Sequence, residues 1–398
     1  MIQHRAHLAL PMALTLLAGC GIAPSLTSAP SVAARATSVV PGEIVVKLRN
    51  TYALPGWTAG AGLRVTRTIP GLSAVVVRAN DTKAAIARLE QDPGVVYAEP
   101  NYVMRKITPA AKVPAFGLLA GDELLDKLWG MQKIGANQVW ASLPGDRKVT
   151  VAVIDSGVDY THPDLAGRTS KGNDFVNFDQ DAMDDDGHGT HCAGTIAGGL
   201  GDGGVVGVAP GVSILPVKVL DANGSGTFAN VAAGIVYAAD QGAPILSMSL
   251  GAGRSSKVLD DAVAHAVARG ALIVAAAGND GSEEPSYPAV MPGVMAVSAT
   301  MKNDKLALFS NIGKHISVAA PGTDILSTYP GGKYESLDGT SMACPHVAGL
   351  AALVKSKNPG FTAKQIRQKI ESAAVDLGAK GFDPTFGNGR IDAVKAVR

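Results

Sequence analysis

Three widely separated segments of the chain carry an acid, an imidazole and a hydroxyl at positions suited to chemistry. Asp155 ends an apolar run, His188 opens a helical segment, and Ser341 stands at the start of an apolar helix. A serine hydroxyl is a weak nucleophile at neutral pH, so it needs a base to take its proton and an acid to orient that base. The three residues could together supply nucleophilic catalysis.

Taken singly, each position also has a structural interpretation. A strand-end Asp is commonly a cap or turn residue, and a serine at a helix start is commonly an N-cap. His188 and His191 could suggest zinc, but they lack both the i,i+4 spacing and the Glu of a zinc-protease helix. Residues 199–204 match G-x-G-x-x-G but follow a predicted helix, which argues against a dinucleotide site.

A fourth position could stabilise the charge that acyl transfer develops. Asn279 follows an apolar run at 272–277. The tetrahedral intermediate carries an oxyanion that needs preorganised donors. The Asn279 amide can serve together with the backbone N–H of Ser341; the alternative for Asn279 is a turn residue before Gly281.

The elements that must position these residues are strands alternating with helices. Apolar runs predict strands at 149–154, 214–220, 245–250, 272–277 and 294–298. Helical spacing predicts helices at 188–197, 228–239, 257–268, 341–355 and 363–372. This alternation is typical of an α/β fold with a parallel sheet covered on both faces, whose chemistry lies at the carboxyl ends of the strands.

Composition and charge bound the class of protein. The 398 residues are 46% hydrophobic and 17% charged, which allows a large core and excludes an extensively disordered chain. The net charge of +1 gives no indication of nucleic-acid binding. Residues 1–107 carry 11 Lys/Arg against 5 Asp/Glu, and residues 108–398 carry 24 against 29. The basic residues 1–107 could bind the acidic residues 108–398 electrostatically. Chance together with a basic leader would explain the uneven charge equally well.

The N-terminus is typical of an exported protein. Residues 1–20 combine Arg5 with an apolar stretch that is too short to span a bilayer and fits a secretory leader. The sequence LAGC at 17–20 looks like a bacterial lipobox, which predicts a lipid on Cys20 that tethers the precursor. An ordinary signal peptide is the alternative.

A small patterned unit at 42–107 lies between linkers at 21–41 and 108–121. Its expected elements are strands at 43–48, 72–78 and 95–98 and a helix at 82–91. Such an α+β unit has a thin core and would be marginal alone. The main body runs from 122 to 398.

The segments VAVIDSGVD, HGTHCAG and GTSMACPHVAG resemble the three signature segments of the subtilisin family of serine endopeptidases, in that family's Asp, His, Ser order. The resemblance covers about 122–398 and is closest to the thermitase and proteinase K side of the family. It implies a three-layer subtilisin-like fold and cleavage of protein and peptide substrates without an organic cofactor. Ser341 would be the nucleophile, His188 the base and Asp155 its orienting acid. Asn279 would belong to the oxyanion hole.

The resemblance also implies a peptide-binding cleft. Ser249, Leu250 and Gly251 would form one wall of the pocket for the residue before the cut and pair with an extended substrate. Ser286 lies in a segment that resembles the pocket floor. No acidic residue stands among them, so we expect a large apolar side chain in this pocket rather than Lys or Arg.

Residues 42–107 resemble the family's propeptide, an α+β ferredoxin-like domain, and end in VVYAEPNYV followed by a short tail. Such a propeptide assists folding, inhibits by laying its tail in the active site and is removed by self-cleavage. Register with the family places the cut near Ile107–Thr108, and the linker permits a cut anywhere in 105–121. The expected product is a secreted, monomeric enzyme whose own propeptide is its inhibitor.

An acidic loop before His188 is a candidate calcium site. Its oxygen-bearing side chains are Asp174, Asn177, Asp179 and Asp181. Clustered oxygen ligands suit a hard cation, and the loop resembles one in thermitase-like enzymes; a solvated acidic loop is the alternative. The resemblance implies a second site with Asp122 and Asp164, although residues 199–205 lack the asparagines that such loops often have.

Two cysteines and two rival functions remain open. Cys192 and Cys344 could pair or remain buried thiols. A catalytically silent binding protein on the same fold is one rival. An esterase of the α/β-hydrolase type is the other, but it would need a G-x-S-x-G elbow that Ser341 lacks.

Overall fold

The computed structural model of the protein describes residues 1, 38–50, 63–107, 112–116, 124–201 and 203–398. The chain divides into two units, Met1–Ala34 and Arg35–Arg398, and the fold below is that of the second. The predicted leader with Cys20, and also Asp122, lie outside the described residues. Within the described ranges, no helix has both the length and the apolar character needed to cross a membrane.

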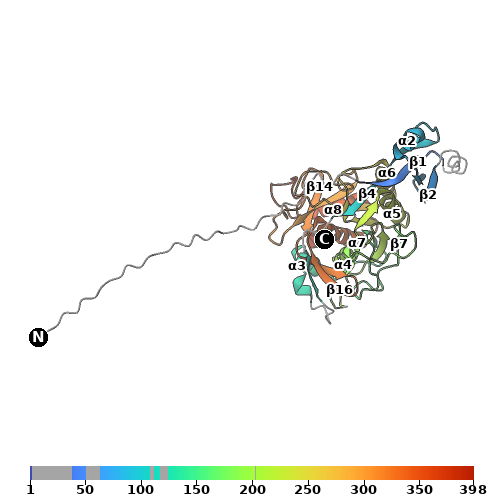
Figure 1. Ribbon diagram of the computed structural model, residues 1–398. Coiled ribbons are helices and arrows are strands. Elements are labelled where there is room, and N and C mark those ends of the chain that lie inside the picture. The colour runs from blue at the N-terminus through green and yellow to red at the C-terminus, as the bar shows by residue number, and fades with distance from the viewer. Residues whose placement is uncertain (2–37, 51–62, 108–111, 117–123, 202) are drawn as a thin grey trace. The chain divides into compact units, whose positions relative to one another are not determined.

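A seven-stranded parallel sheet forms the centre of this unit (Figure 1). Its order is β14-β13-β12-β10-β6-β8-β7, and every neighbouring pair is parallel. The strands are β6 (Thr150–Asp155), β7 (Asn173–Asp174), β8 (Ser213–Lys218), β10 (Ile245–Met248), β12 (Leu272–Ala276), β13 (Val294–Thr300) and β14 (Ile316–Pro321). The five predicted strands are confirmed, and β7 and β14 are additional strands at the two edges.

Helices cover both faces of this sheet because its strands are apolar on both faces. Val151 and Val153 of β6 belong to the core cluster that includes α4, α7 and α8. Ala152 and Ile154, which alternate with them, belong to the cluster that includes α5 and α6. The helices are α4 (His188–Ala197), α5 (Phe228–Asp240), α6 (Lys257–Ala268), α7 (Thr340–Lys357) and α8 (Ala363–Ala373). This arrangement is the predicted three-layer α/β architecture.

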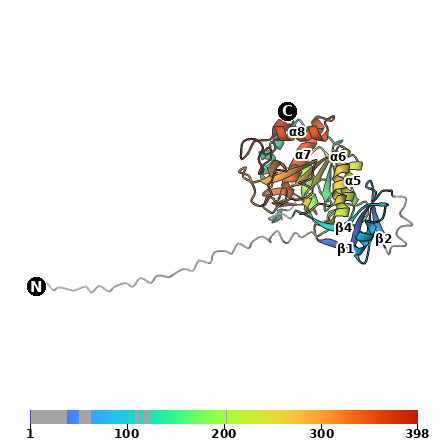
Figure 2. The same ribbon diagram turned by 90° about the horizontal axis from the view of Figure 1, so that it is seen from above.

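The segment before Ile107 forms an antiparallel sheet with strand order β4-β1-β3-β2. Its elements are β1 (Val39–Leu48), β2 (Arg64–Ile69), β3 (Ala74–Arg78), α2 (Thr82–Leu89) and β4 (Val95–Lys106). Sequence analysis missed β2, whose residues alternate in burial without a continuous apolar run. In Figure 2, β1, β2 and β4 lie together near α5, and β4 contacts that helix.

β4 continues well past the strand predicted at 95–98. Its second half pairs antiparallel with β9 (Ser225–Thr227) and with β11 (Leu250–Gly251). These partners stand more than a hundred residues later in the chain, so local sequence patterns cannot indicate them. The propeptide-like unit therefore ends as a strand held between two segments of the main body.

Residues 108–121 are not wholly the linker that the sequence predicts. Lys112–Phe116 form β5, which pairs antiparallel with β16 (Lys333–Leu337), and β16 pairs with β15 (Ile325–Tyr329). The free edge of the β15–β16 hairpin supplies the main-chain hydrogen-bond partners that make residues 112–116 a strand. The remaining short helices are η3 (Leu125–Lys127), α3 (Trp129–Lys133), η4 (Ala136–Gln138) and α9 (Ala393–Ala396).

Candidate active site

Asp155 and His188 meet at the carboxyl edge of the central sheet. Asp155 is the last residue of β6, and His188 is the first of α4. Nδ1 of His188 lies 2.8 Å from Oδ1 of Asp155, and both side chains are at most 2% exposed. Because the carboxylate accepts the Nδ1 proton, Nε2 keeps the lone pair of a base. Among the described residues, Nε2 has no hydrogen-bond partner.

Ser341, the second residue of α7, faces the end of the propeptide-like strand. Its Oγ lies 3.0 Å from the carbonyl oxygen of Ile107 and 3.2 Å from that of Ser249. The hydroxyl has one proton, so it donates to one of these carbonyls at a time. The buried Ser341 is therefore in contact with the peptide group that follows the bound strand.

Asn279 follows β12 and is fixed by the residue before Ser341. Its Oδ1 accepts the N–H of Thr340 at 2.9 Å and the hydroxyl of Thr340 at 2.8 Å. These two bonds orient the amide so that Nδ2 lies beside Gly339, where an added Cβ would stand only 3.1 Å from it. The arrangement puts an N–H donor next to the helix that carries Ser341.

Asp184, which sequence analysis did not single out, holds the start of α4. Its Oδ1 accepts the hydroxyl of Ser156 and the N–H of Gly187, both at 2.9 Å. Its Oδ2 accepts the N–H and the hydroxyl of Thr190. Burial raises the pKa of Asp184, and these hydrogen bonds oppose the rise. Asp184 thus connects the residue after Asp155 with the turn that presents the imidazole.

Lys218 is a second missed residue next to this pair. It ends β8 opposite Asp155 and is 1% exposed. Its ammonium group donates to the carbonyl oxygens of Ser156 (2.7 Å) and Leu220 (3.0 Å) and to Asp185. The detectable signal was a lysine inside an otherwise apolar strand, because a buried charge needs partners.

The predicted cleft residues surround the bound strand. The N–H of Ile107 donates to the carbonyl of Ser249 at 3.2 Å, and Leu250 and Gly251 pair with the two residues before Ile107. A Cβ on Gly251 would lie 2.5 Å from Oγ of Ser286 and 3.5 Å from Cδ1 of Ile107. Ile107, which is 1% exposed, therefore lies buried beside Gly251 and Ser286.

The propeptide-like unit also caps two helices of the main body. The carboxylate of Glu99 accepts the N–H groups of Lys257 and Val258 at the start of α6, each at 2.9 Å. Oδ1 of Asn101 accepts the N–H of Ala229 in the first turn of α5 at 3.2 Å. The first N–H groups of a helix lack partners within it and favour acceptors and negative charge.

Hydrogen bonds connect all four residues of the predicted calcium set in the acidic loop. Asp174 and Asp179 are adjacent, because the N–H of each donates to the carbonyl of the other. Asn177 donates from Nδ2 to Oδ2 of Asp174 at 2.9 Å. The main-chain N–H of Asp181 donates to Oδ1 of Asp179 at 2.9 Å, and the carboxylate of Asp181 accepts the hydroxyl of Tyr160 at 2.7 Å. These groups carry the oxygen atoms that calcium prefers, and the carboxylate of Asp174 accepts the N–H groups of Val176 and Asn177 as well.

Asp164, the described member of the second predicted calcium set, is fully buried. Its carboxylate accepts the hydroxyl of Tyr334 at 3.0 Å and the N–H of Val205 at 2.9 Å. Both oxygen atoms thus have protein donors. Among the described residues, the one group of three His, Cys, Asp or Glu side chains near enough to hold an ion is Asp155, His188 and Cys192.

Cys192 and Cys344 are free, buried thiols. Sγ of Cys192 lies 3.6 Å from the carbonyl oxygen of Ser341. Burial raises the pKa of the Cys344 thiol to about 11. His191 is packed inside, with Nε2 donating to main-chain carbonyls of β15 and β16, so it does not contribute a base.

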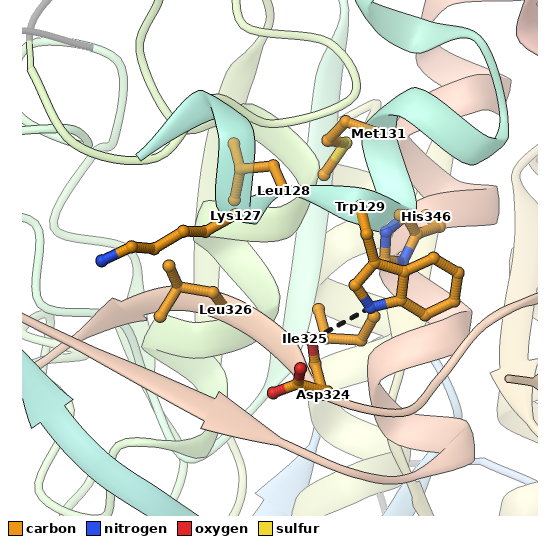
Figure 3. A pocket seen from close by; sticks show the side chains of 9 residues that line it. Lys127, Leu128, Trp129, Met131, Asp324, Ile325, Leu326 and His346 are labelled. Atoms are coloured by element: carbon orange, nitrogen blue, oxygen red, sulfur yellow. Dashed lines mark hydrogen bonds between the residues drawn. The ribbon is translucent and has the colours of Figure 1, made fainter. Parts of the chain in front are cut away.

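A small cavity lies between α3 and the start of β15 (Figure 3). The indole N–H of Trp129 donates to the carbonyl of Asp324 at 3.1 Å, and His346, which also lines the cavity, lies beside Trp129. Its volume of about 10 Å³ is close to the space of a single water molecule. This cavity is too small for a substrate.

Comparisons with known proteins agree with this site. Residues 146–389 match the Subtilase family, and residues 27–101 match the Fervidolysin N-terminal prodomain. The chain is 43% identical over 323 residues to the Thermophilic serine proteinase of Bacillus sp. (strain AK1), covering 81% of this chain and 77% of that protein. It is 46% identical over 271 residues to Thermitase of Thermoactinomyces vulgaris, covering 68% and 95%.

A solved structure is similar across both parts of the chain. It is the crystal structure of fervidolysin from Fervidobacterium pennivorans, described as a keratinolytic enzyme related to subtilisin. The TM-score is 0.82 at 32% identity, and the match covers 90% of this chain and 61% of fervidolysin. The chain belongs to the subtilase family. It is a serine-type endopeptidase with an N-terminal propeptide, and the predicted subtilisin-like fold is confirmed.

Proposed function

We propose that Ser341 is the nucleophile both for removing the propeptide, residues 42–107, from the catalytic domain, residues 122–398, and for cleaving substrates. The observation that carries the proposal is the position of the propeptide tail. It is paired on both sides as an extended strand, with the carbonyl oxygen of Ile107 lying 3.0 Å from Oγ of Ser341. The bond cut in maturation is then the one after Ile107.

The chemistry follows from the groups around that carbonyl. The Ser341 hydroxyl turns toward His188, gives its proton to Nε2, and Oγ attacks the carbonyl carbon of Ile107. Asp155 stabilises the imidazolium. The C–N bond breaks, the leaving amine takes the proton from Nε2, and water hydrolyses the resulting ester by the same route. The Ser341 hydroxyl must rotate because it bonds to carbonyl oxygens in this structure and not to Nε2 of His188.

Asn279 and the backbone N–H of Ser341 are proposed as the oxyanion donors. The two bonds from Thr340 hold the Asn279 amide in place before reaction, which is what electrostatic preorganisation requires. Removing one such donor, for which subtilisin is the standard example, lowers kcat on the order of 100- to 1,000-fold. Asn279→Ala is expected to show a loss in that range.

The pocket for the residue before the cut is proposed to accept apolar side chains. The wall formed by Ser249, Leu250 and Gly251, and the nearby Ser286, present main-chain and small neutral groups. The side chain of Ile107 is buried against them. A carboxylate that could pair with Lys or Arg is not among these residues.

We further propose a structural calcium ion at the loop of Asp174, Asn177 and Asp179, with the buried Asp174 at its centre. Support comes from the donor chemistry and from the adjacency of Asp174 and Asp179. The ion would hold the loop that leads to His188. A second ion is proposed at Asp122 and Asp164. Both oxygen atoms of Asp164 have protein donors in this structure, as do both oxygen atoms of Asp174.

Export is proposed from residues 1–20, with a monomeric, secreted enzyme as product. If Cys20 carries a lipid, the anchor belongs to the propeptide side of the cut after Ile107. The uncut precursor would then be tethered, and the mature enzyme would be freed from membranes once its propeptide is degraded. Fractionation of wild type, Ser341→Ala and Cys20→Ala tests this: a soluble Ser341→Ala precursor with Cys20 intact favours an ordinary signal peptide.

The decisive experiment is Ser341→Ala in a protease-free host, with Ser372→Ala as a control at an exposed serine. We expect an uncut precursor without casein-clearing activity for Ser341→Ala and normal processing for the control. Normal processing of Ser341→Ala would reject self-cleavage. Wild-type protein that hydrolyses a nitrophenyl ester but not casein would indicate an esterase, and protein inactive on both would indicate a silent binding protein.

A further inference from the structure

The residue before Ile107 in the bound tail makes an ion pair inside the cleft. The ammonium group of Lys106 lies 2.6 Å from Oδ1 of Asp186 and within hydrogen-bond distance of Oδ2 as well. The Asp186 side chain is 6% exposed, and that of Lys106 is 19% exposed. A pair this far from solvent is screened much less than one on the surface.

The space around Lys106 fits a long, unbranched side chain. The N–H of Lys106 donates to the carbonyl of Gly224 at 2.8 Å. An added Cβ on Gly224 would come within 2.5–2.6 Å of three carbons of the lysine stem. The aliphatic part of the Lys106 side chain therefore packs against Gly224, where a side chain would clash and φ is +65°. The ammonium group beyond it contacts the carboxylate of Asp186.

Asp186 is held in place by the active-site loop as well as by its cation. Oδ1 accepts the N–H of His188 at 3.2 Å, and the main-chain N–H of Asp186 donates to Asp184 at 3.0 Å. The hydroxyl of Tyr329 donates to the Asp186 carbonyl at 3.1 Å. Within the described part of the chain, the one ion pair of Asp186 is with Lys106. Departure of the propeptide therefore leaves a fixed, cation-free carboxylate two residues before the base.

We propose that Asp186 determines specificity for the second residue on the N-terminal side of the cut, where the enzyme prefers Lys or Arg. The inference rests on the proposed function, because it treats the tail as a bound substrate. The neighbouring Arg105 is exposed and donates to the hydroxyl of Ser225. Lys106 is therefore the basic residue of the tail that an acid in the main body recognises. Preferred substrates combine a basic residue at this position with an apolar residue at the cut.

The test compares two peptides that differ at one position. Both carry Ile at the cut, preceded by Lys in one and by uncharged norleucine in the other. A hydrogen-bonded charge pair of this kind predicts a kcat/KM about 10- to 100-fold higher for the lysine peptide. Asp186→Asn keeps an oxygen for the His188 N–H but removes the charge, and it is expected to reduce the ratio to within about threefold.

Asp126→Asn is the matched control, since it removes the same charge from an exposed position outside the cleft, and it is expected to keep the wild-type ratio. Equal cleavage of both peptides by wild type, or an unchanged ratio in Asp186→Asn, would overturn the inference. Should Asp186→Asn fail to fold, the wild-type comparison alone decides. Failure of wild type to cleave casein or either peptide would instead refute the proposed function.

Discussion

Acidification is expected to destabilise the fold through two buried histidines. His191 donates from Nε2 to the carbonyls of Ile325 and Glu335, at 2.9 and 3.0 Å. His346 donates from Nδ1 to the carbonyl of Met342 at 2.8 Å. The second nitrogen of each ring is buried without a partner among the described residues. Burial lowers the pKa of His191 to about 3 and that of His346 to about 4, so both stay neutral in the folded protein at pH 5.

The sign and size of the effect follow from proton binding. In the unfolded chain these histidines have their ordinary pKa of about 6.5. Between pH 7 and pH 5 the unfolded state binds more protons than the folded state, so the free energy of unfolding falls as pH falls. The loss is about 2 kcal/mol for each histidine over that interval, about 4 kcal/mol together. That is a large part of the ~5–15 kcal/mol typical of a domain.

The assay is urea unfolding of the full chain with Ser341→Ala, which prevents self-digestion. His346→Asn is added because the Asn amide can still donate to the carbonyl of Met342 while one titrating group is removed. The loss between pH 7 and pH 5 is expected to be about 2 kcal/mol smaller in this variant. Measurement at pH 8, where the imidazoles are neutral in both states, gives the cost of the substitution itself. An identical pH 7 to pH 5 loss in both proteins would refute the reasoning.

Three further outcomes test the site. Chelation is expected to lower the melting temperature of wild type but not of Asp174→Asn, because a bound ion stabilises the native state by mass action; equal melting of wild type with and without chelator would remove the calcium proposal. A mercurial is expected to inhibit slowly through Cys192, whose pKa burial raises, and full activity after confirmed modification would contradict this. Lys218→Met is expected to lower kcat and to change KM less, and Lys218→Arg is expected to recover part of the lost kcat. If Lys218→Met changes only the melting temperature, Lys218 has a structural role alone.

The fold could be predicted from sequence because its signals are local. Each strand of the central sheet between the two edge strands is mostly apolar, and the carboxyl ends of parallel strands meet at one edge. That rule places Asp155 and Asn279 on the same side of the sheet. The first turns of α4 and α7, which carry His188 and Ser341, follow from the helical apolar spacing.

The remaining contacts depend on partners far away in the chain. The acidic run at 184–186 looks like a solvated loop in sequence, yet each of its three carboxylates has a different partner in the fold: Ser156 and Thr190, Lys218, and Lys106. Nothing in the spacing of these residues indicates which acid pairs with which group. The second half of β4 was missed for the same reason, since its hydrogen bonds belong to β9 and β11.

The geometry of the tail also determines what cutting it achieves. The strand pairing with β9 and β11, the caps made by Glu99 and Asn101, and the ion pair of Lys47 with Asp261 at 2.8 Å all lie on the N-terminal side of Ile107. The proposed hydrolysis after Ile107 would break none of them, so we expect the cut propeptide to stay bound as an inhibitor. Its release would then require loss of its own fold, whose core between the sheet and α2 has nine buried side chains among the residues that the structure describes. We therefore expect activation to be limited by destruction of the propeptide rather than by the first cut.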